Sequence, residues 1–246
     1  MVIRICLAAL TAAFALPVCA AETHVAVAAN FTEPAKEIAA DFEKATGHKA
    51  VLAFGSAGAF FTQITRGAPF EVFLSADAER PIRAENEGYT VIGTRFTYAI
   101  GRLVLYSTTP GLVDGKGDVL KSQRFDKLAI ADPKIAPYGT AAIETMHKLG
   151  VYDALKAKIV SGSSIAQAYQ FTSTGAAQLG FVALSQVITV RGGSRWIVPT
   201  KLHRPIDQQA VLLKTGKNNP AARAFIQYLK SGKALAIIRR YGYAAK

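Results

Sequence analysis

Four turns of this sequence could bind an anion, because each stands where a polar residue precedes a helix. They are the turns at Asn30, at Ser56, at Tyr138, and at residues 161–164 before Ile165. The first backbone N–H groups of a helix have no partner within it, and the helix dipole adds partial positive charge at the same end. Such a turn favours an anion without a lysine. Capping of the helix by the side chain is the alternative role for Asn30 and Ser56.

Neutral donors of this kind favour a fully deprotonated oxyanion. A dianion stripped of water is costly to bury unless it is fully hydrogen-bonded. Each hydrogen bond to a charged group contributes about 1.5 to 3 kcal/mol, so about six neutral donors offset the lost hydration. A site with donors only disfavours hydrogen phosphate, whose proton would meet no acceptor. Discrimination against sulfate would then depend on cavity size.

A secreted hydrolase with Ser56 as its nucleophile is the alternative from another class of protein. A nucleophile elbow needs the pattern G-x-S-x-G, and Phe54 stands at its first glycine position. The histidines show no pairing with this serine and form no H-x-x-x-H metal pair; they are His24, His48, His147 and His203. We therefore expect neither a catalytic residue nor a direct metal ligand.

Apolar segments of strand length alternate with longer segments of helical periodicity along the chain. This alternation is typical of βαβ units and predicts an α/β fold with mostly parallel sheets flanked by helices. Strands are expected at residues 24–29, 50–54, 72–75, 128–131, 159–160 and 179–183. Helices are expected at residues 35–45, 59–65, 139–149, 165–172 and 220–241, the last broken at Ser231-Gly232.

Two further segments, residues 98–106 and 202–213, are predicted to cross between two lobes. The expected division is residues 21–100 plus 206–246 for the first lobe and residues 101–205 for the second. A cleft between such lobes is a favoured ligand site, because strand ends and helix N-termini converge there.

Residues 1–20 are typical of a cleavable signal peptide, with Arg4 before an apolar run that ends at Val18-Cys19-Ala20. The run is shorter than the roughly 18 residues that a membrane span needs. A lipid-modified Cys19 would require a small residue where Val18 stands. We expect a periplasmic mature chain that begins near Ala21 and contains no cysteine, because Cys6 and Cys19 both precede that point.

The formal net charge of the chain is +12. Removing Arg4 with the signal peptide leaves 28 Lys and Arg residues against 17 Asp and Glu residues, a net charge of +11. Such a charge can indicate nucleic acid, an anionic membrane or an anionic ligand as the partner. The basic residues are spread along the chain and form no runs, which favours a solvated surface. We expect no nucleic-acid partner.

Six segments resemble the periplasmic molybdate-binding protein of an ATP-binding cassette (ABC) importer, in that family's order and over nearly all of the mature chain. They are Val27-Ala28-Ala29-Asn30-Phe31, Phe54-Gly55-Ser56-Ala57-Gly58, Val72-Phe73-Leu74-Ser75-Ala76-Asp77, Pro137-Tyr138-Gly139-Thr140-Ala141, Gly180-Phe181-Val182-Ala183-Leu184 and Pro205-Ile206-Asp207-Gln208-Gln209-Ala210. The resemblance implies the two-lobed periplasmic-binding fold and a tetrahedral oxyanion, molybdate or tungstate, as the ligand. It also implies an inner-membrane ABC permease as the partner, no cofactor, and a monomer.

The same resemblance implies a set of ligand contacts in this chain: Asn30, its neighbour Ala29, Ser56, Tyr138, and Ile165 through its backbone N–H. One departure concerns Ala183, since some members of the family have a tyrosine at the end of that strand. Those members tend to have a small residue where this chain has Tyr138, so we expect Tyr138 to supply the missing hydroxyl. Molybdate and tungstate have the same charge and nearly the same size, and a receptor for sulfate or phosphate is the alternative within this class.

Overall fold

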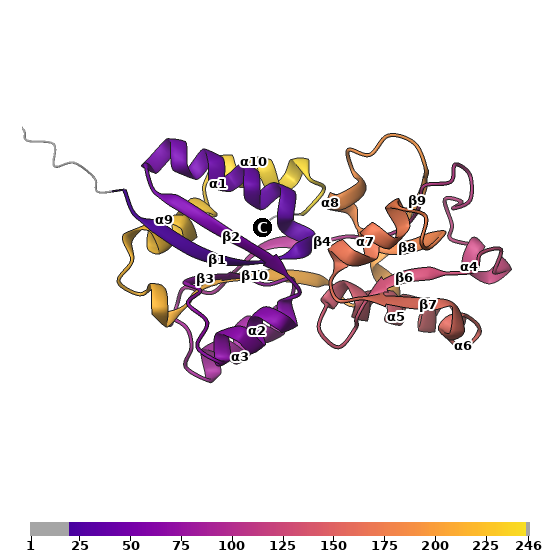
Figure 1. The fold of residues 1–246 in the computed structure, drawn as a ribbon, viewed down its shortest axis with the longest axis horizontal. Coiled ribbons are helices and arrows are strands. Elements are labelled where there is room, and N and C mark those ends of the chain that lie inside the picture. The colour runs from indigo at the N-terminus through magenta and orange to yellow at the C-terminus, as the bar shows by residue number, and fades with distance from the viewer. Residues whose placement is uncertain (1–19, 245–246) are drawn as a thin grey trace, which may run out of the picture.

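The computed structural model describes residues 20–244, which form two lobes side by side (Figure 1). Each lobe is built on one five-stranded sheet. Lobe 1 is defined by the sheet whose strands lie in the order β2 (Lys49–Gly55), β1 (Glu22–Ala28), β3 (Val72–Leu74), β10 (Ile206–Leu212) and β4 (Phe96–Gly101). Lobe 2 is defined by the sheet ordered β7 (Ile159–Gly162), β6 (Leu128–Ala131), β8 (Leu179–Ala183), β5 (Leu103–Ser107) and β9 (Ser194–Ile197). The predicted two-lobed α/β fold is confirmed.

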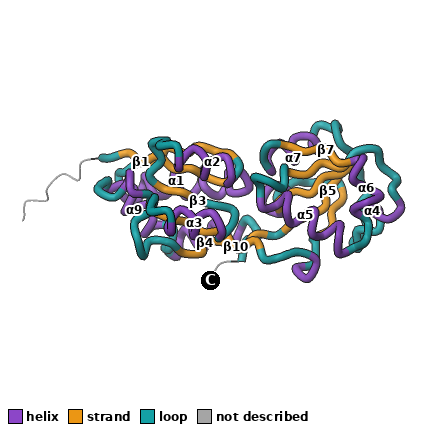
Figure 2. Tube along the Cα trace, turned by 90° about the horizontal axis from the view of Figure 1, so that it is seen from below, coloured by secondary structure: helices purple, strands orange, loops and turns teal. Residues whose placement is uncertain are grey.

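Helices flank both sheets, and Figure 2 shows the strands enclosed by them in each lobe. The helices of lobe 1 are η1 (Ala29–Phe31), α1 (Thr32–Thr46), α2 (Ala57–Thr65), α3 (Glu79–Asn86), η4 (Lys214–Gly216), α9 (Pro220–Tyr228) and α10 (Gly232–Arg240). Those of lobe 2 are α4 (Val119–Ser122), α5 (Pro137–Lys148), α6 (Tyr152–Leu155), η2 (Lys156–Lys158), α7 (Ile165–Ser173), α8 (Leu184–Val187) and η3 (Thr200–Leu202). The predicted signal peptide, residues 1–20, lies outside the described residues except for Ala20.

Strand β1 shows how the sequence pattern builds the layers of lobe 1. Successive side chains of a strand point to opposite faces of the sheet. Val25 and Val27 pack in the cluster that contains α1, α9 and α10, whereas Ala26 belongs to the cluster that contains Phe60 of α2. Figure 1 shows α1 and α10 on one side of this sheet and α2 and α3 on the other. Because both faces are covered, the strand is apolar throughout its second half.

The strand directions refine the prediction of mostly parallel sheets. In lobe 1, β1 is parallel to β2 and β3, and β10 is antiparallel to β3 and β4. In lobe 2, β6 is parallel to β7 and β8, and β5 is antiparallel to β8 and β9. Each sheet is therefore mixed, because β10 and β5, the strands by which the chain enters lobe 1 and lobe 2, run against the other four strands of their sheets.

The chain passes between the lobes at two adjacent places. The first passage is from β4 to β5, and the second leads from η3 into β10. Strand β9 is a further element that the sequence pattern did not indicate. Tyr138, expected in a loop, lies in the first turn of α5, and Ala57 and Gly58, expected in a turn, begin α2. Among residues 20–244, no helix has the length and apolar character needed to cross a bilayer.

Candidate ligand-binding site

A small buried pocket lies between the lobes, where strand ends meet helix starts. Lobe 1 contributes Ala28, Ala29, Asn30, Gly55, Ser56, Ala57 and Ala76, and lobe 2 contributes Ala136, Pro137, Tyr138 and Ile165. All five residues expected to contact the ligand are in this set, so the structure brings them together from four separate segments. None of the lining side chains carries a charge. The pocket therefore has polar groups without a cationic clamp.

Backbone N–H groups at the helix starts are the most numerous donors of this pocket. Ala57 is the first residue of α2, Ile165 is the first residue of α7, and Tyr138 follows the proline that begins α5. Helix geometry gives these three N–H groups no acceptor within their own helices. The partial positive charge at each helix start adds to their attraction for an anion.

Ser56 caps its helix and also lines the pocket. Its Oγ accepts a hydrogen bond from the N–H of Ala59 at 3.3 Å and so caps α2. The hydroxyl proton stays available, because accepting a bond uses only a lone pair. Ser164 caps α7 in the same way, with its Oγ accepting from Gln167 at 3.3 Å, but only Ile165 of that segment lines the pocket.

Asn30 offers the pocket its backbone N–H group and not the N–H groups of its side-chain amide. Its amide nitrogen Nδ2 donates to Gln208 Oε1 at 2.8 Å and to the Tyr243 hydroxyl at 3.0 Å. An amide NH₂ group has two protons, so both are used inside the protein. The backbone N–H of Asn30, in the short helix η1, is therefore the donor that this residue can offer to a ligand.

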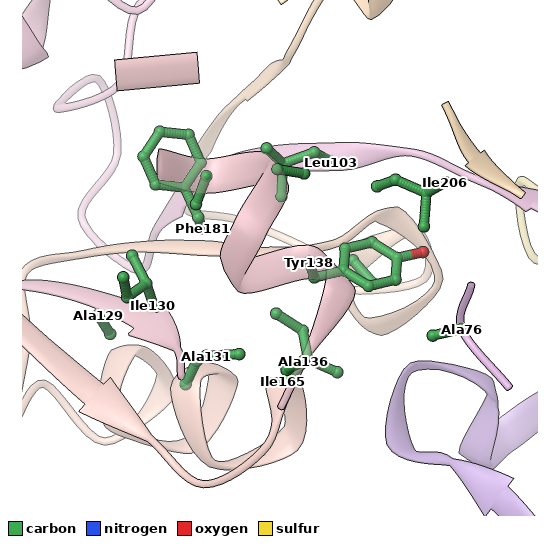
Figure 3. Close-up of a cluster of buried hydrophobic side chains, with 14 of the residues drawn as sticks. Ala76, Leu103, Ala129, Ile130, Ala131, Ala136, Tyr138, Ile165, Phe181 and Ile206 are labelled. Carbon is green, nitrogen blue, oxygen red and sulfur yellow. The ribbon is translucent and has the colours of Figure 1, made fainter. Parts of the chain in front are cut away.

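Tyr138 reaches from lobe 2 toward lobe 1. Figure 3 shows its hydroxyl oxygen directed toward Ile206, away from the lobe 2 core around Phe181. Gln208 Nε2 donates to this oxygen at 3.3 Å, which leaves the phenol proton for another acceptor. Burial, followed by the nearby Tyr243 and Tyr98 hydroxyls, raises the pKa of Tyr138 well above its ordinary value. The hydroxyl is therefore a neutral donor at physiological pH.

The contacts of Ser56 are those of a helix cap and not of a catalytic nucleophile. No histidine is among the residues that line the pocket, and the imidazole of His203 is buried elsewhere, with Nδ1 at 2.7 Å from the carbonyl oxygen of Arg204. Activation of a serine requires a base within hydrogen-bond reach. Among the described residues, the pocket lining therefore contains no histidine beside Ser56.

Contacts across the cleft hold the lobes together beside the pocket. The N–H of Gly58 in α2 donates to the carbonyl of Ile135 in lobe 2 at 2.9 Å. Ser185 Oγ in α8 donates to the carbonyl oxygen of Asn30 at 2.7 Å. The lining side chains of Asn30, Ser56, Tyr138 and Ile165 are all buried in this arrangement. The structure is therefore a closed form, in which the lobes meet on both sides of the pocket.

Four buried polar residues next to the pocket escaped the sequence reasoning. Tyr98, Ser185, Gln208 and Tyr243 form hydrogen bonds with Asn30, with Tyr138 or with one another. No pattern of residue types joins them, because they lie on three separate elements and in the segment after α10. One signal was present: Gln208 alternates with Ile206 and Ala210 on the buried face of its strand, where an amide requires partners.

Comparison with known proteins agrees with the fold and the pocket. Residues 23–244 match the family model described as bacterial extracellular solute-binding protein. The chain is 60% identical over 238 residues to the molybdate-binding protein ModA of Rhodobacter capsulatus, covering 97% of this chain and 94% of that protein. It is 58% identical over 227 residues to ModA of Azotobacter vinelandii, covering 91% of this chain and 90% of that protein.

A solved structure gives the same answer at the level of the backbone. The periplasmic molybdate-binding protein of Azotobacter vinelandii superposes with a TM-score of 0.89 and 43% identity, covering 91% of this chain and 99% of that chain. The resemblance predicted from the six sequence segments is confirmed by these matches. The chain belongs to the bacterial extracellular solute-binding proteins and, among them, to the family of the molybdate-binding proteins.

Proposed function

We propose that this protein captures molybdate or tungstate outside the cytoplasm and delivers it to an ABC importer. Relatives with 60% and 58% identity are named molybdate-binding proteins, and the identity extends over almost the whole chain. The observation that carries the proposal is the uncharged pocket between the lobes, lined by helix starts and hydroxyl groups.

The ligand contacts in this proposal come from both lobes. Lobe 1 offers the Ser56 hydroxyl and the backbone N–H groups of Ala29 and Asn30. Lobe 2 offers the Tyr138 hydroxyl and the backbone N–H of Ile165. Hydrogen bonds to a charged group contribute about 1.5 to 3 kcal/mol each, so these donors offset the hydration that a dianion loses on burial.

Closure of the lobes is the step that couples binding to transport. A ligand that contacts both lobes favours the closed form, because an open form offers it the donors of only one lobe. The permease then recognises the two lobes in their closed arrangement. Neutral donors also make release easier than a buried Arg or Lys would, because no ion pair has to be separated.

The remaining parts of the proposal concern location and partners. Residues 1–20 act as a cleavable signal peptide, so the mature protein begins near Ala21 in the periplasm. It acts as a monomer without a cofactor, has no catalytic activity, and binds no nucleic acid. A sulfate or phosphate receptor is the alternative ligand class, and the site offers no specific feature that favours it.

Isothermal titration calorimetry on the chain from Ala21 tests the ligand. Molybdate and tungstate are expected to bind with comparable affinity, and sulfate and phosphate much more weakly. Absence of both heat and thermal stabilisation with molybdate and tungstate would show the ligand assignment to be wrong. Comparable binding of sulfate would instead identify a broader oxyanion receptor. A Ser56-dependent esterase activity, tested with Ser56→Ala, would contradict the absence of catalysis.

A further inference from the structure

We propose that Gln208 is a positioning residue that turns the Tyr138 hydroxyl proton toward the ligand and links the two lobes beside the pocket. The inference rests on the proposed function, because it concerns the same site. Gln208 lies in β10, the strand by which the chain returns to lobe 1, and its side chain is fully buried. A buried amide is costly unless its oxygen and its nitrogen both find partners.

The partners of Gln208 belong to both lobes. Its oxygen Oε1 accepts from Asn30 Nδ2 at 2.8 Å and from the Tyr98 hydroxyl at 3.0 Å, both in lobe 1. Its nitrogen Nε2 donates to the Tyr138 hydroxyl oxygen at 3.3 Å, in lobe 2. One side chain therefore joins two of the residues proposed to contact the ligand, one from each lobe.

The chemistry of these groups sets the direction of each hydrogen bond. The Asn30 amide nitrogen can only donate, so the atom of Gln208 that faces it must be the oxygen. The nitrogen of Gln208 then faces Tyr138, and the Tyr138 oxygen must accept. The phenol proton of Tyr138 consequently points away from Gln208. The neighbouring Tyr243 hydroxyl is one acceptor for it, and a ligand oxygen in the pocket that Tyr138 lines would be the stronger, charged acceptor.

The backbone around this contact leaves room for it. The register between β10 and β4 shifts between Gln208 and Gln209, which leaves Tyr98 of β4 without a partner residue of its own. Such a bulge changes the direction of a side chain, and the Tyr98 hydroxyl reaches Gln208. At Gly101, a Cβ atom would lie 2.2 Å from the Tyr138 hydroxyl oxygen and 2.8 Å from Gln208 Nε2. Only glycine at position 101 accommodates both groups.

A double-mutant cycle separates positioning from packing. Gln208→Met keeps the length of the side chain and removes both polar ends. It is expected to weaken molybdate binding by about 10- to 100-fold, since Tyr138 would lose the bond that orients it. In a Tyr138→Phe background the same change should weaken binding by less than about threefold, because there is no hydroxyl left to orient. Equal effects in both backgrounds would overturn the proposal.

The matched control is Gln209→Met, on the next residue of the same strand. Gln209 Oε1 accepts from Arg95 Nη1 at 2.9 Å, and its Nε2 donates to Thr97 Oγ1 at 3.3 Å, so it has no contact with the pocket. The affinity of Gln209→Met should equal that of the unmodified protein. If the unmodified protein binds none of the oxyanions, the proposed function has failed. If it binds and Gln208→Met binds equally well, only the role of Gln208 has failed.

A second variant keeps the test decisive if Gln208→Met does not fold. In Gln208→Glu, a protonated carboxyl can still accept from Asn30 and donate to Tyr138, whereas a carboxylate can only accept. The ionised form would draw the Tyr138 proton away from the ligand and repel the anion. Binding relative to the unmodified protein at the same pH should therefore recover toward acid and fall as the pH rises. Weakening by the same factor at every pH would overturn the proposal.

Discussion

Among residues 20–244, Tyr138 supplies the one phenol that lines the pocket, and removal of its hydroxyl tests the site at the scale of a single atom. Tyr138→Phe is expected to weaken molybdate binding by about 1 to 3 kcal/mol, because a hydrogen bond to a charged ligand is lost. Tyr228→Phe is the control, since the Tyr228 hydroxyl donates to Asp41 Oδ2 at 2.6 Å, away from the pocket. Calorimetry measures both. An unchanged affinity in Tyr138→Phe would remove this residue from the site.

The same hydroxyl determines how binding responds to pH. Burial raises the pKa of Tyr138 well above its ordinary value. Because the pKa is raised, the Tyr138 hydroxyl stays fully protonated below that value and can donate. It loses its proton only as the pH rises through the pKa. No other lining side chain titrates, so the affinity for the dianion should stay constant within about twofold from about pH 6 to about pH 9. A titration near neutrality, measured by calorimetry, would indicate a histidine or carboxyl group in the site.

Asn30 was expected in the pocket, but the sequence did not show which of its groups would face the ligand. Its position after β1 marked it as a ligand contact, and it does line the pocket. The sequence offered no means to see that both protons of its amide are used by Gln208 and Tyr243, which are 178 and 213 residues away. Whether Tyr138 replaces a hydroxyl missing at Ala183 stays a prediction.

Among the elements, the start of α2 has a role in closure that its sequence does not reveal. A Cβ atom at Gly58 would lie 2.8 Å from the Ile135 Cα of the opposite lobe. Gly58→Ala is therefore expected to lower the apparent affinity about tenfold, since it disfavours the closed form without touching the ligand. Because alanine favours a helix by up to about 1 kcal/mol over glycine, the stability of the ligand-free protein should not fall.

Gly232→Ala is the matched control for this change, since a Cβ atom there, near the start of α10, would meet nothing within 4 Å. It should leave both affinity and closure unchanged. Small-angle X-ray scattering at a molybdate concentration near the dissociation constant of Gly232→Ala should show a larger radius of gyration for Gly58→Ala than for Gly232→Ala. Equal radii and equal affinities would show that the α2 contact does not govern closure.

Most elements of the fold were predictable, because hydrophobic periodicity and helix-start residues are local signals. Helix α7 and strand β8 agree with the prediction within one residue at each end. Strand β9 was not predictable from the sequence, since Ser194–Ile197 is a short edge strand with exposed positions and no strong hydrophobic pattern. The directions of β5 and β10 were also beyond the sequence, because they depend on where the chain passes between lobes.

At the scale of the whole molecule, charge and binding site are separate. The chain has a net charge of +12, yet no charged side chain lines the pocket. Surface charge acts over long distances on the rate of encounter and is screened by salt, whereas short hydrogen bonds control the rate of release. Association of molybdate should therefore slow several-fold between about 10 mM and about 300 mM salt. Dissociation should change little.

Stopped-flow measurement of tyrosine fluorescence can follow both rates, since the buried Tyr138 lines the pocket between the lobes. Sodium chloride suits this test, because chloride is a poor competitor for a site shaped for a tetrahedral dianion. A dissociation rate that rises with salt as steeply as the association rate falls would place charged groups in the site itself.

The buried pocket sets a limit on how the ion can exchange. Because Asn30 and Tyr138 are almost completely inaccessible and α2 contacts Ile135 of the opposite lobe, we expect a bound ion to leave only when the lobes separate. The rate at which the lobes separate then limits the rate of dissociation. Chemically different anions that fit the pocket would therefore dissociate no faster than the lobes open. A transporter that takes up the ion must therefore separate the two lobes, because competition for the ion alone would not release it.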